Sequence, residues 1–106
     1  MTVRNLDAVF APRSVVLAGG SPRPGSAGRV ILAGLREAGF AGPIGLVNPD
    51  HARIDEFSAV RTFGELAAPP DLVVVTAPPD AVPSIISDAG AAGARAAVVV
   101  TRGLGA

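Results

Sequence analysis

The chain has 106 residues, 49% of them hydrophobic, and its nine basic and nine acidic side chains give a formal net charge of zero. Cysteine, tryptophan and tyrosine are absent and there is one histidine, which excludes disulfides, thiolate zinc sites and aromatic platforms for single-stranded nucleic acid. The longest apolar runs are far shorter than the roughly 20 residues that span a bilayer. We therefore expect one cytoplasmic domain that binds neither membranes nor nucleic acid.

The N-terminal quarter of the chain predicts a helical turn and then a buried strand. Residues 5–10 place three apolar side chains on one helical face, and Pro12 ends that turn. Residues 14–18 read Ser-Val-Val-Leu-Ala and lead directly into two glycines. Because this run is continuously apolar rather than alternating, it is typical of a strand covered on both faces, as in a parallel sheet.

A helix and a second strand follow. Residues 27–38 carry an apolar stripe at helical spacing, and Ser26 is placed to cap the N-terminus. Gly39 suits the left-handed position after the last helical residue, and Phe40 can then contact the final turn. Residues 44–47 predict a short strand that ends at an Asn-Pro pair.

The pattern restarts in the second half, after a weakly patterned stretch. Residues 50–70 predict only a short strand near 59–61 and a helical turn near 63–66. Residues 72–76 predict a strand, and residues 96–101 predict a final strand. Between them, Asp80 is expected to cap a helix that runs to about residue 92. Strand–helix–strand units of this length predict an α/β, Rossmann-like, three-layer fold around a mostly parallel sheet of about five strands. Because the sequence stops just after a strand, we expect it to be the N-terminal part of a longer enzyme.

The loop between the first strand and the first helix, residues 19–28, reads Gly-Gly-Ser-Pro-Arg-Pro-Gly-Ser-Ala-Gly. Strand, glycines and helix in this order are typical of a phosphate site, because the first helical turn has unpaired N–H groups and a partial positive charge. Ser21 and Ser26 add hydroxyl groups and Arg23 adds a cation. Arg29 opposes the helix dipole, a conflict that a nearby bound anion would relieve.

The sequence indicates the identity of the ligand less directly than it indicates a phosphate site. The loop is longer than the G-x-G-x-x-G dinucleotide fingerprint, and the second strand does not end in an acidic ribose reader. A P-loop is excluded because the chain has no lysine. These departures disfavour NAD without excluding it.

Several segments together give the chain a resemblance to the CoA-binding domain of NDP-forming (ADP-forming) acyl-CoA synthetases, relatives of the succinyl-CoA synthetase α subunit. The same domain also occurs fused to bacterial protein acetyltransferases. The resemblance extends over essentially the whole chain in the right order. It is carried by residues 5–15, 19–28, 38–40, 47–49, 69–72, 76–79 and 100–103.

The resemblance implies a domain that binds coenzyme A across the carboxyl ends of its strands. The implied cofactor-binding residues are Gly19, Gly20, Ser21, Pro22, Arg23, Pro24, Gly25 and Ser26 in the first loop, then Asn48 and Pro49, then Thr76, Ala77 and Pro78 beside the pantetheine arm, and finally Val100, Thr101 and Arg102.

One position departs from the family pattern. A basic residue often follows the Asn-Pro of the second strand, but here Asp50 stands there, followed by His51 and Arg53. An acid at this position repels phosphate, so either His51 or Arg53 takes over its role or the affinity for CoA falls.

The resemblance also implies partners. In the family a histidine on a following domain carries the phosphoryl group and an ATP-grasp domain binds ATP or ADP, so we expect this chain to bind CoA without catalysing a reaction. Within the sequence, no catalytic set or metal-binding cluster is recognisable. Two other hypotheses stay open. The first is an NAD(P)-binding domain of an oxidoreductase, in which Asp50 or Arg53 contacts the ribose, and the second is a non-catalytic CoA-sensing module.

Overall fold

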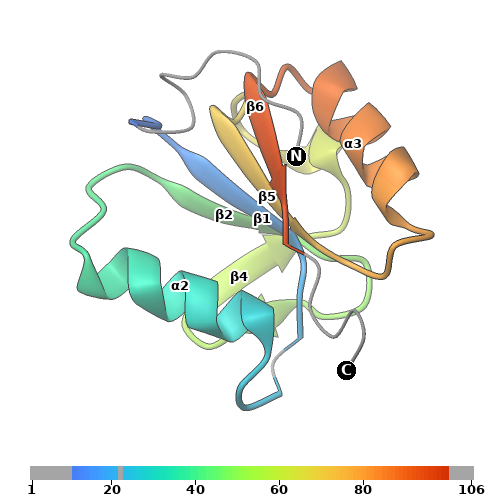
Figure 1. Ribbon diagram of the computed structural model, residues 1–106. Helices are drawn as coiled ribbons and strands as arrows, with labels where there is room; N and C mark the ends of the chain where they lie inside the picture. The colour runs from blue at the N-terminus through green and yellow to red at the C-terminus, as the bar shows by residue number, and fades with distance from the viewer. Residues whose placement is uncertain (1–10, 22, 101–106) are drawn as a thin grey trace.

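The computed structural model of the protein describes residues 11–21 and 23–100, and the predicted turn at residues 5–10 lies outside this part. Figure 1 shows its strands and helices. In chain order they are β1 (Val15–Gly19), α2 (Ala27–Glu37), β2 (Ile44–Val47), β3 (Arg53–Ile54), β4 (Phe57–Val60), the 3₁₀ turn η1 (Phe63–Glu65), β5 (Leu72–Thr76), α3 (Val82–Ala91) and β6 (Ala96–Val99).

The strands form one sheet in the order β3-β4-β2-β1-β5-β6, with α2 and α3 on opposite faces (Figure 1). All its described pairings are parallel except β3 with β4, which is an antiparallel hairpin. This confirms the predicted α/β, Rossmann-like, mostly parallel fold. The sheet has six strands rather than about five, because the two residues of β3 are too few to leave a periodic signal in the sequence.

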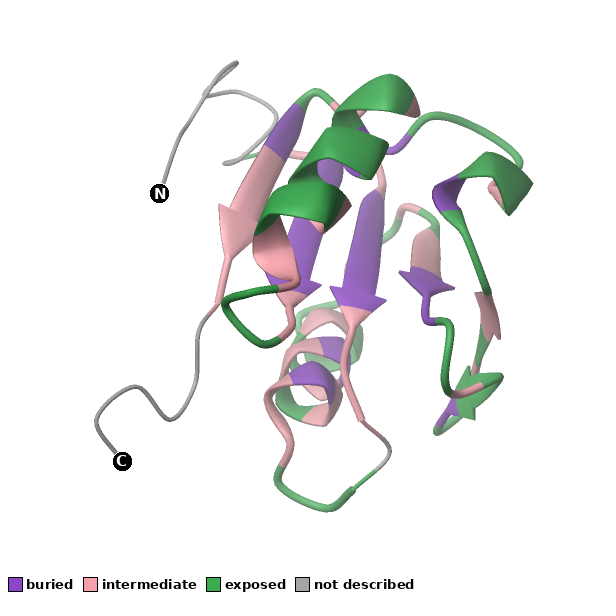
Figure 2. Cartoon of the chain, turned by 90° about the vertical axis from the view of Figure 1, so that its right-hand side faces the viewer, coloured by how far each residue is buried: buried purple, intermediate pink, exposed green. Residues whose placement is uncertain are grey.

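The side chains of the central strand β1 divide between two hydrophobic layers. Leu17 packs in the cluster that contains Leu32 of α2, while Val16 packs in the cluster that contains Ala89 of α3. The central strands are therefore buried on both faces, as Figure 2 shows by colour. Burial on both faces explains why β1 and β5 read as continuous apolar runs rather than as alternating ones.

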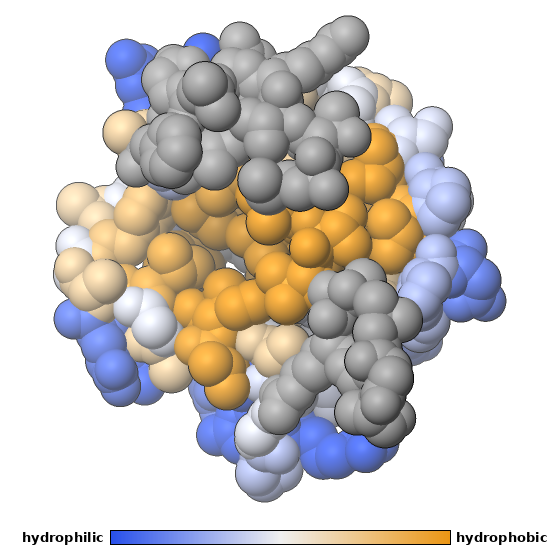
Figure 3. Space-filling model, in the orientation of Figure 1, coloured by the Kyte–Doolittle hydropathy of each residue, from blue (hydrophilic) through white to orange (hydrophobic). Residues whose placement is uncertain are grey.

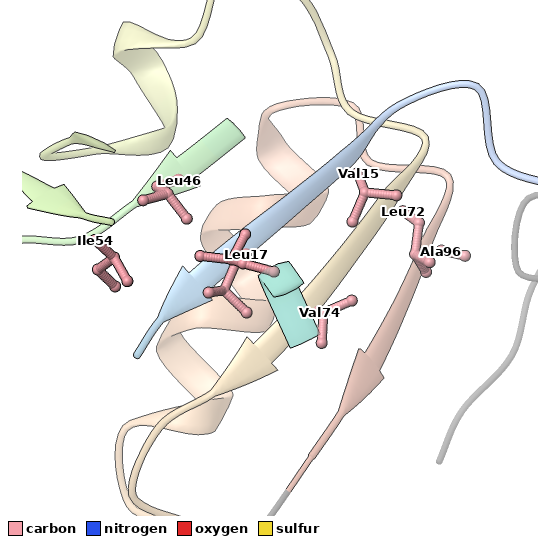
Figure 4. Close-up of a cluster of buried hydrophobic side chains, with 8 residues drawn as sticks. Val15, Leu17, Leu46, Ile54, Leu72, Val74 and Ala96 are labelled. Carbon is pink, nitrogen blue, oxygen red and sulfur yellow. The ribbon is translucent and has the colours of Figure 1, made fainter. Parts of the chain in front are cut away.

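The layer on the α2 side extends over the width of the sheet. Figure 4 shows Leu17 in the middle of this cluster, with Leu46 of β2 on one side and Val74 of β5 on the other. Toward the β6 edge, Val98 and Val100 are only partly buried. Figure 3, which looks onto this β6 edge of the sheet, shows apolar side chains gathered over its middle.

Both ends of α2 are as predicted from the sequence. Ser26 occupies the N-cap and its hydroxyl accepts a hydrogen bond from the backbone N–H of Arg29 at 3.3 Å. At the other end Gly39 has a φ of +74°, and the N–H of Phe40 donates to the carbonyl oxygen of Leu35 at 3.0 Å. This is the Schellman arrangement, and it confirms the predicted stop at Gly39.

One local prediction was wrong, and the bounds of another element were shifted. Asp80 does not cap α3: the N-cap position is Ala81, which has no side-chain cap, because a turn in which the N–H of Ala81 donates to the carbonyl oxygen of Pro78 delays the helix by one residue. The strand expected near 59–61 starts earlier, as β4, since it pairs with β3 through the Asp55-Glu56 turn. The helical turn expected near 63–66 is present as η1.

Candidate functional site

A cavity of about 1600 Å³ opens at the carboxyl ends of the parallel strands. Its lining residues include the last two residues of β1 and the Gly20 that follows, Val47 at the end of β2 and Thr76 at the end of β5. In Figure 2 the arrowheads of the central strands point to this edge. The chain leaves β1 toward β2 on one side and later adds β5 on the other, so the cavity lies at the topological switch point, where open α/β sheets bind their ligands. Its volume exceeds the 300–1,000 Å³ or so that suits drug-sized ligands, which favours a long, extended one.

The loop that leaves β1 is held against the end of β5. The N–H of Gly20 donates to the carbonyl oxygen of Thr76 at 3.0 Å. Gly19 has a φ of +90°, and a Cβ atom at this position would lie 2.3 Å from the same carbonyl oxygen. Only glycine fits there, because any side chain would displace one strand end from the other.

The N-terminus of α2 packs closely on this loop. A Cβ atom on Gly28, in the first turn, would lie 3.1 Å from the Cα atom of Gly20. The Ser26 hydroxyl, besides capping the helix, donates to the carbonyl oxygen of Ser21 at 2.6 Å. The loop thus lies against the N-terminus of α2, and the positive end of a helix stabilises a bound anion.

Asn48, at the end of β2, joins two loops of the cavity. It is only 3% exposed. Its Nδ2 donates to the carbonyl oxygens of Gly19 and Gly20, both at 3.1 Å, and its Oδ1 accepts from the N–H groups of Asp50 at 2.9 Å and His51 at 3.0 Å. Two donors and two acceptors use the whole hydrogen-bonding capacity of an asparagine side chain. Asn48 therefore positions the loops.

Thr76, at the end of β5, carries a buried polar atom that the fold leaves unsatisfied. Within the described part of the chain, its Oγ1 is buried and has no hydrogen-bond partner. The residue lines the cavity, and a Cβ atom on Gly20 would lie 3.5 Å from this oxygen. Unsatisfied buried hydroxyls are uncommon and are a typical feature of binding sites.

The basic side chains of α2 contact the hairpin rather than the loop. Arg29 meets the carboxylate of Asp55 with two nitrogens, Nε at 3.2 Å and Nη2 at 3.0 Å. This ion pair, not a bound anion, relieves the conflict between Arg29 and the helix dipole. About two helical turns further along α2, Arg36 donates a hydrogen bond to the carboxylate of Glu56. This hydrogen bond lowers the pKa of the Glu56 carboxyl.

The structure brings the predicted site residues together. Every one of them that is described lines the cavity, from Gly19 to Ser26, from Asn48 to Pro49, from Thr76 to Pro78, and Val100. Pro22, Thr101 and Arg102 lie outside the described residues. Their contact with a ligand stays a prediction, as it does for all the others.

The cavity also has walls that the sequence prediction missed. Residues 61–64, which follow β4, form one wall, and Ser84 and Asp88 of α3 contribute to another. Arg61, like Thr76, lies at the carboxyl end of a parallel strand, but the strand expected near 59–61 included Arg61, whereas β4 ends at Val60. His51 and Arg53, the predicted substitutes for a basic residue after Asn48-Pro49, are not among the lining residues.

Two further properties bear on the site. Within residues 11–21 and 23–100, no group of three or more histidine, aspartate or glutamate side chains is placed to hold a metal ion. In the same part of the chain, neither α2 nor α3 is long and apolar enough to cross a membrane.

Comparison with known proteins gives consistent matches. The chain is 30% identical over 105 residues to the α subunit of acetate–CoA ligase [ADP-forming] I of Pyrococcus furiosus, which is 95% of this chain but 23% of that protein. It is 29% identical to acetate–CoA ligase [ADP-forming] II of Archaeoglobus fulgidus, over 96% of this chain and 15% of that one. The chain thus spans less than a quarter of the length of these relatives.

Solved structures agree with the sequence matches. The dinucleotide forming acetyl-coenzyme A synthetase 1 of Ca. Korarchaeum cryptofilum, in complex with phosphate and ADP, superposes with a TM-score of 0.85 at 29% identity. That likeness covers 96% of this chain and 22% of the synthetase. A conserved hypothetical protein of Pyrococcus furiosus is 31% identical with a TM-score of 0.67, over 76% of this chain and 68% of that one.

The family model described as CoA binding domain matches residues 13–103, which include every strand and helix of the structure. Together with the predicted fold and the cavity at the strand ends, this match confirms the resemblance to the CoA-binding part of ADP-forming acyl-CoA synthetases. The chain belongs to the CoA binding domain family.

Proposed function

We propose that this chain binds coenzyme A along the cavity, with residues 19–28 holding the diphosphate. The observation that carries the proposal is that one cavity unites this loop, the N-terminus of α2 and the ends of β2 and β5. A diphosphate on the loop meets the N–H groups and positive end of α2, the Ser21 hydroxyl and the Arg23 guanidinium. The Arg23 side chain is exposed and lines the cavity, so it can reach the ligand without breaking a core contact.

The rest of CoA has a place in the same cavity. Thr76, Ala77 and Pro78 follow β5 on the far side of the switch point and suit the pantetheine arm. Pantetheine has two amides and a hydroxyl, and these groups can satisfy the buried Oγ1 of Thr76. Val100 and, beyond the described residues, Thr101 and Arg102 extend the proposed contact segment.

The alternative ligand, NAD(P), is less well supported. A dinucleotide domain reads its ribose with an acidic side chain at the end of the second strand, where this chain has Asn48. The Asn48 side chain is already occupied by four hydrogen bonds to the backbone. Of the two proposed ribose readers, Arg53 is not among the residues that line the cavity, and Asp50 lines it but lies three residues beyond the end of β2, after Pro49.

We further propose that the domain serves an ADP-forming acyl-CoA ligase. The proposal is supported by the sequence similarity to two acetate–CoA ligases. The chain covers 23% of the length of one of them and 15% of the other. In such an enzyme, ATP or ADP and the phosphohistidine belong to other domains or subunits, including an ATP-grasp domain, and these are the proposed partners. This chain then supplies the carrier, and the residues that react with it lie elsewhere. A CoA-sensing module would bind CoA in the same way but would have no such partners.

The loop assignment is tested by calorimetric titration of CoA into the wild type and into the variant Ser21→Ala/Arg23→Ala. Loss of two hydrogen-bonding groups, one of them charged, predicts an affinity at least about tenfold weaker. Ser87→Ala, on the exposed face of α3 and away from the cavity, is the control. Unchanged affinity in the double variant contradicts the assignment.

A further inference from the structure

We propose that Arg61 reads the 3′-phosphate of coenzyme A, in place of a basic residue after Asn48-Pro49. This inference rests on the proposed function, because it concerns one part of the same ligand. CoA carries two separate anionic groups, a diphosphate and a phosphate on the 3′ position of its ribose. A site that holds both needs a second source of positive charge besides the loop and the N-terminus of α2.

The cavity contains such a second cation. Among its described lining residues only Arg23 and Arg61 carry a positive charge. Both side chains are exposed, and within the described part of the chain neither forms an ion pair with a carboxylate. By contrast, the two arginines of α2 are paired with acids of the β3–β4 turn. The cavity therefore holds two cations that are available to an anionic ligand.

The sheet register sets Arg61 at the right edge. β4 runs parallel to β2 with Val60 opposite Val47, and the N–H of Asn48 donates to the carbonyl oxygen of Val60 at 2.8 Å. Arg61 is the next residue, so it leaves the sheet beside Asn48. The end of β4 is two strands from the end of β1, or roughly 10 Å at the usual strand spacing. Arg61 thus lies across β2 from the loop that follows β1, and its flexible side chain can extend toward a phosphate that is one ribose away from a diphosphate on that loop.

The other charged residues of this region do not fit the role. Asp50 lines the cavity but carries the wrong sign for a phosphate. His51 and Arg53 do not line it, and the Arg53 guanidinium reaches the hydroxyl of Ser58 on the neighbouring strand, at 3.5 Å. On this side of the cavity, Arg61 is thus the described group that can offset Asp50 and attract the 3′-phosphate.

The test compares CoA with dephospho-CoA, which lacks only the 3′-phosphate, by calorimetric titration of the whole chain. For the wild type we expect CoA to bind about tenfold more tightly, the usual effect of a charge-assisted hydrogen bond at an exposed site. Arg61→Gln should lose most of this preference, because its affinity for CoA falls while its affinity for dephospho-CoA is unchanged. Arg61→Lys should keep part of it. The matched control, Arg53→Gln, removes the same charge outside the cavity and should keep the full preference.

Other outcomes overturn the inference. Equal affinity of the wild type for the two ligands would show that no residue reads the 3′-phosphate. If Arg61→Gln loses affinity equally for both ligands, Arg61 contacts another part of CoA. If its preference for CoA over dephospho-CoA is unchanged, Arg61 does not bind the ligand. Circular dichroism confirms that the variants are folded. If the wild type binds neither ligand, the proposed function fails as well, which separates the two failures.

Discussion

The side-chain amide of Asn48, at the end of β2, donates a hydrogen bond to the carbonyl oxygen of Gly20, just past the end of β1, at 3.1 Å. A second bond from the same Nδ2 reaches Gly19, and the Oδ1 fixes the start of the next loop. Two loops that line the cavity thus share one buried side chain. The loop at residues 19–28 is therefore held in place by a residue that need not itself contact a ligand.

Asn48→Ala should destabilise the protein by about 2–3 kcal/mol, because it leaves two carbonyl oxygens and two N–H groups without their partner in a buried position. The free energy of unfolding in urea measures this loss. Asn48→Asp keeps the shape and the two acceptor bonds but sets a carboxylate oxygen against both glycine carbonyls, so it should destabilise as well. Stability within about 0.5 kcal/mol of the wild type in both variants would contradict this role.

Gly19→Ala should destabilise by at least about 2 kcal/mol, since its Cβ atom would meet the carbonyl oxygen of Thr76 at 2.3 Å and its φ is +90°. Gly34→Ala is the matched control. Gly34 lies inside α2, and a Cβ atom there meets nothing within 4 Å. That substitution should stabilise the protein by about 0.5–1 kcal/mol. Thermal or urea unfolding of both variants should show shifts of opposite sign, and shifts of the same sign would refute the close approach of β1 and β5.

Ser26→Ala removes the N-cap of α2 and the bond to the carbonyl oxygen of Ser21. The expected loss is about 1 kcal/mol in the free energy of unfolding, together with weaker binding of CoA because the loop is no longer tied to the helix. Ser87→Ala, at an exposed position within α3, makes the same chemical change where there is no cap. It should be neutral or slightly stabilising. Equal effects of the two substitutions would argue against the capping role.

The contact between Arg36 and Glu56 predicts a pH dependence. The hydrogen bond from Arg36 lowers the pKa of Glu56 below its ordinary 4.5, so the folded state binds this proton less readily than the unfolded state does. The stabilisation is present above about pH 4.5 and is lost as the pH falls through the lower pKa of the folded state. Glu56→Gln should therefore lose less stability than the wild type between about pH 6 and pH 3.

The effect is small, because both side chains are exposed to solvent. Arg36→Gln should flatten the pH profile in the same way, and the double variant should add nothing further. Urea unfolding across the acid range measures all four proteins. A steeper acid loss in Glu56→Gln than in the wild type would show the opposite sign and contradict the contact.

How much of this molecule the sequence predicts depends on how local each feature is. The strands 44–47 and 72–76 have the predicted bounds, since an apolar run closed by proline or glycine signals is a local feature. The stop of α2 at Gly39 is local in the same sense. Membership of the cavity was also predictable for the strand ends, because parallel strands bring their carboxyl ends to one edge.

The features that were missed depend on partners distant in the sequence. Strand β3 has two residues and exists through its pairing with β4, so no periodicity marks it. The partner of Arg29 is Asp55, 26 residues away, and nothing near Arg29 in the sequence indicates it. That Asn48 binds the cofactor stays a prediction, but its hydrogen bonds to the backbone of two loops were not foreseen, because one of those loops is 29 residues away in the sequence. Arg61 was overlooked because the strand expected near 59–61 included it, whereas β4 ends at Val60.

Calorimetric titration of the wild-type chain with CoA and, separately, with NAD tests the central claim most directly. Because the loop is longer than the dinucleotide fingerprint and β2 is followed by Asn48 rather than by an acidic ribose reader, we expect saturable binding of CoA at one site and much weaker binding of NAD. Binding of NAD without binding of CoA would contradict the account.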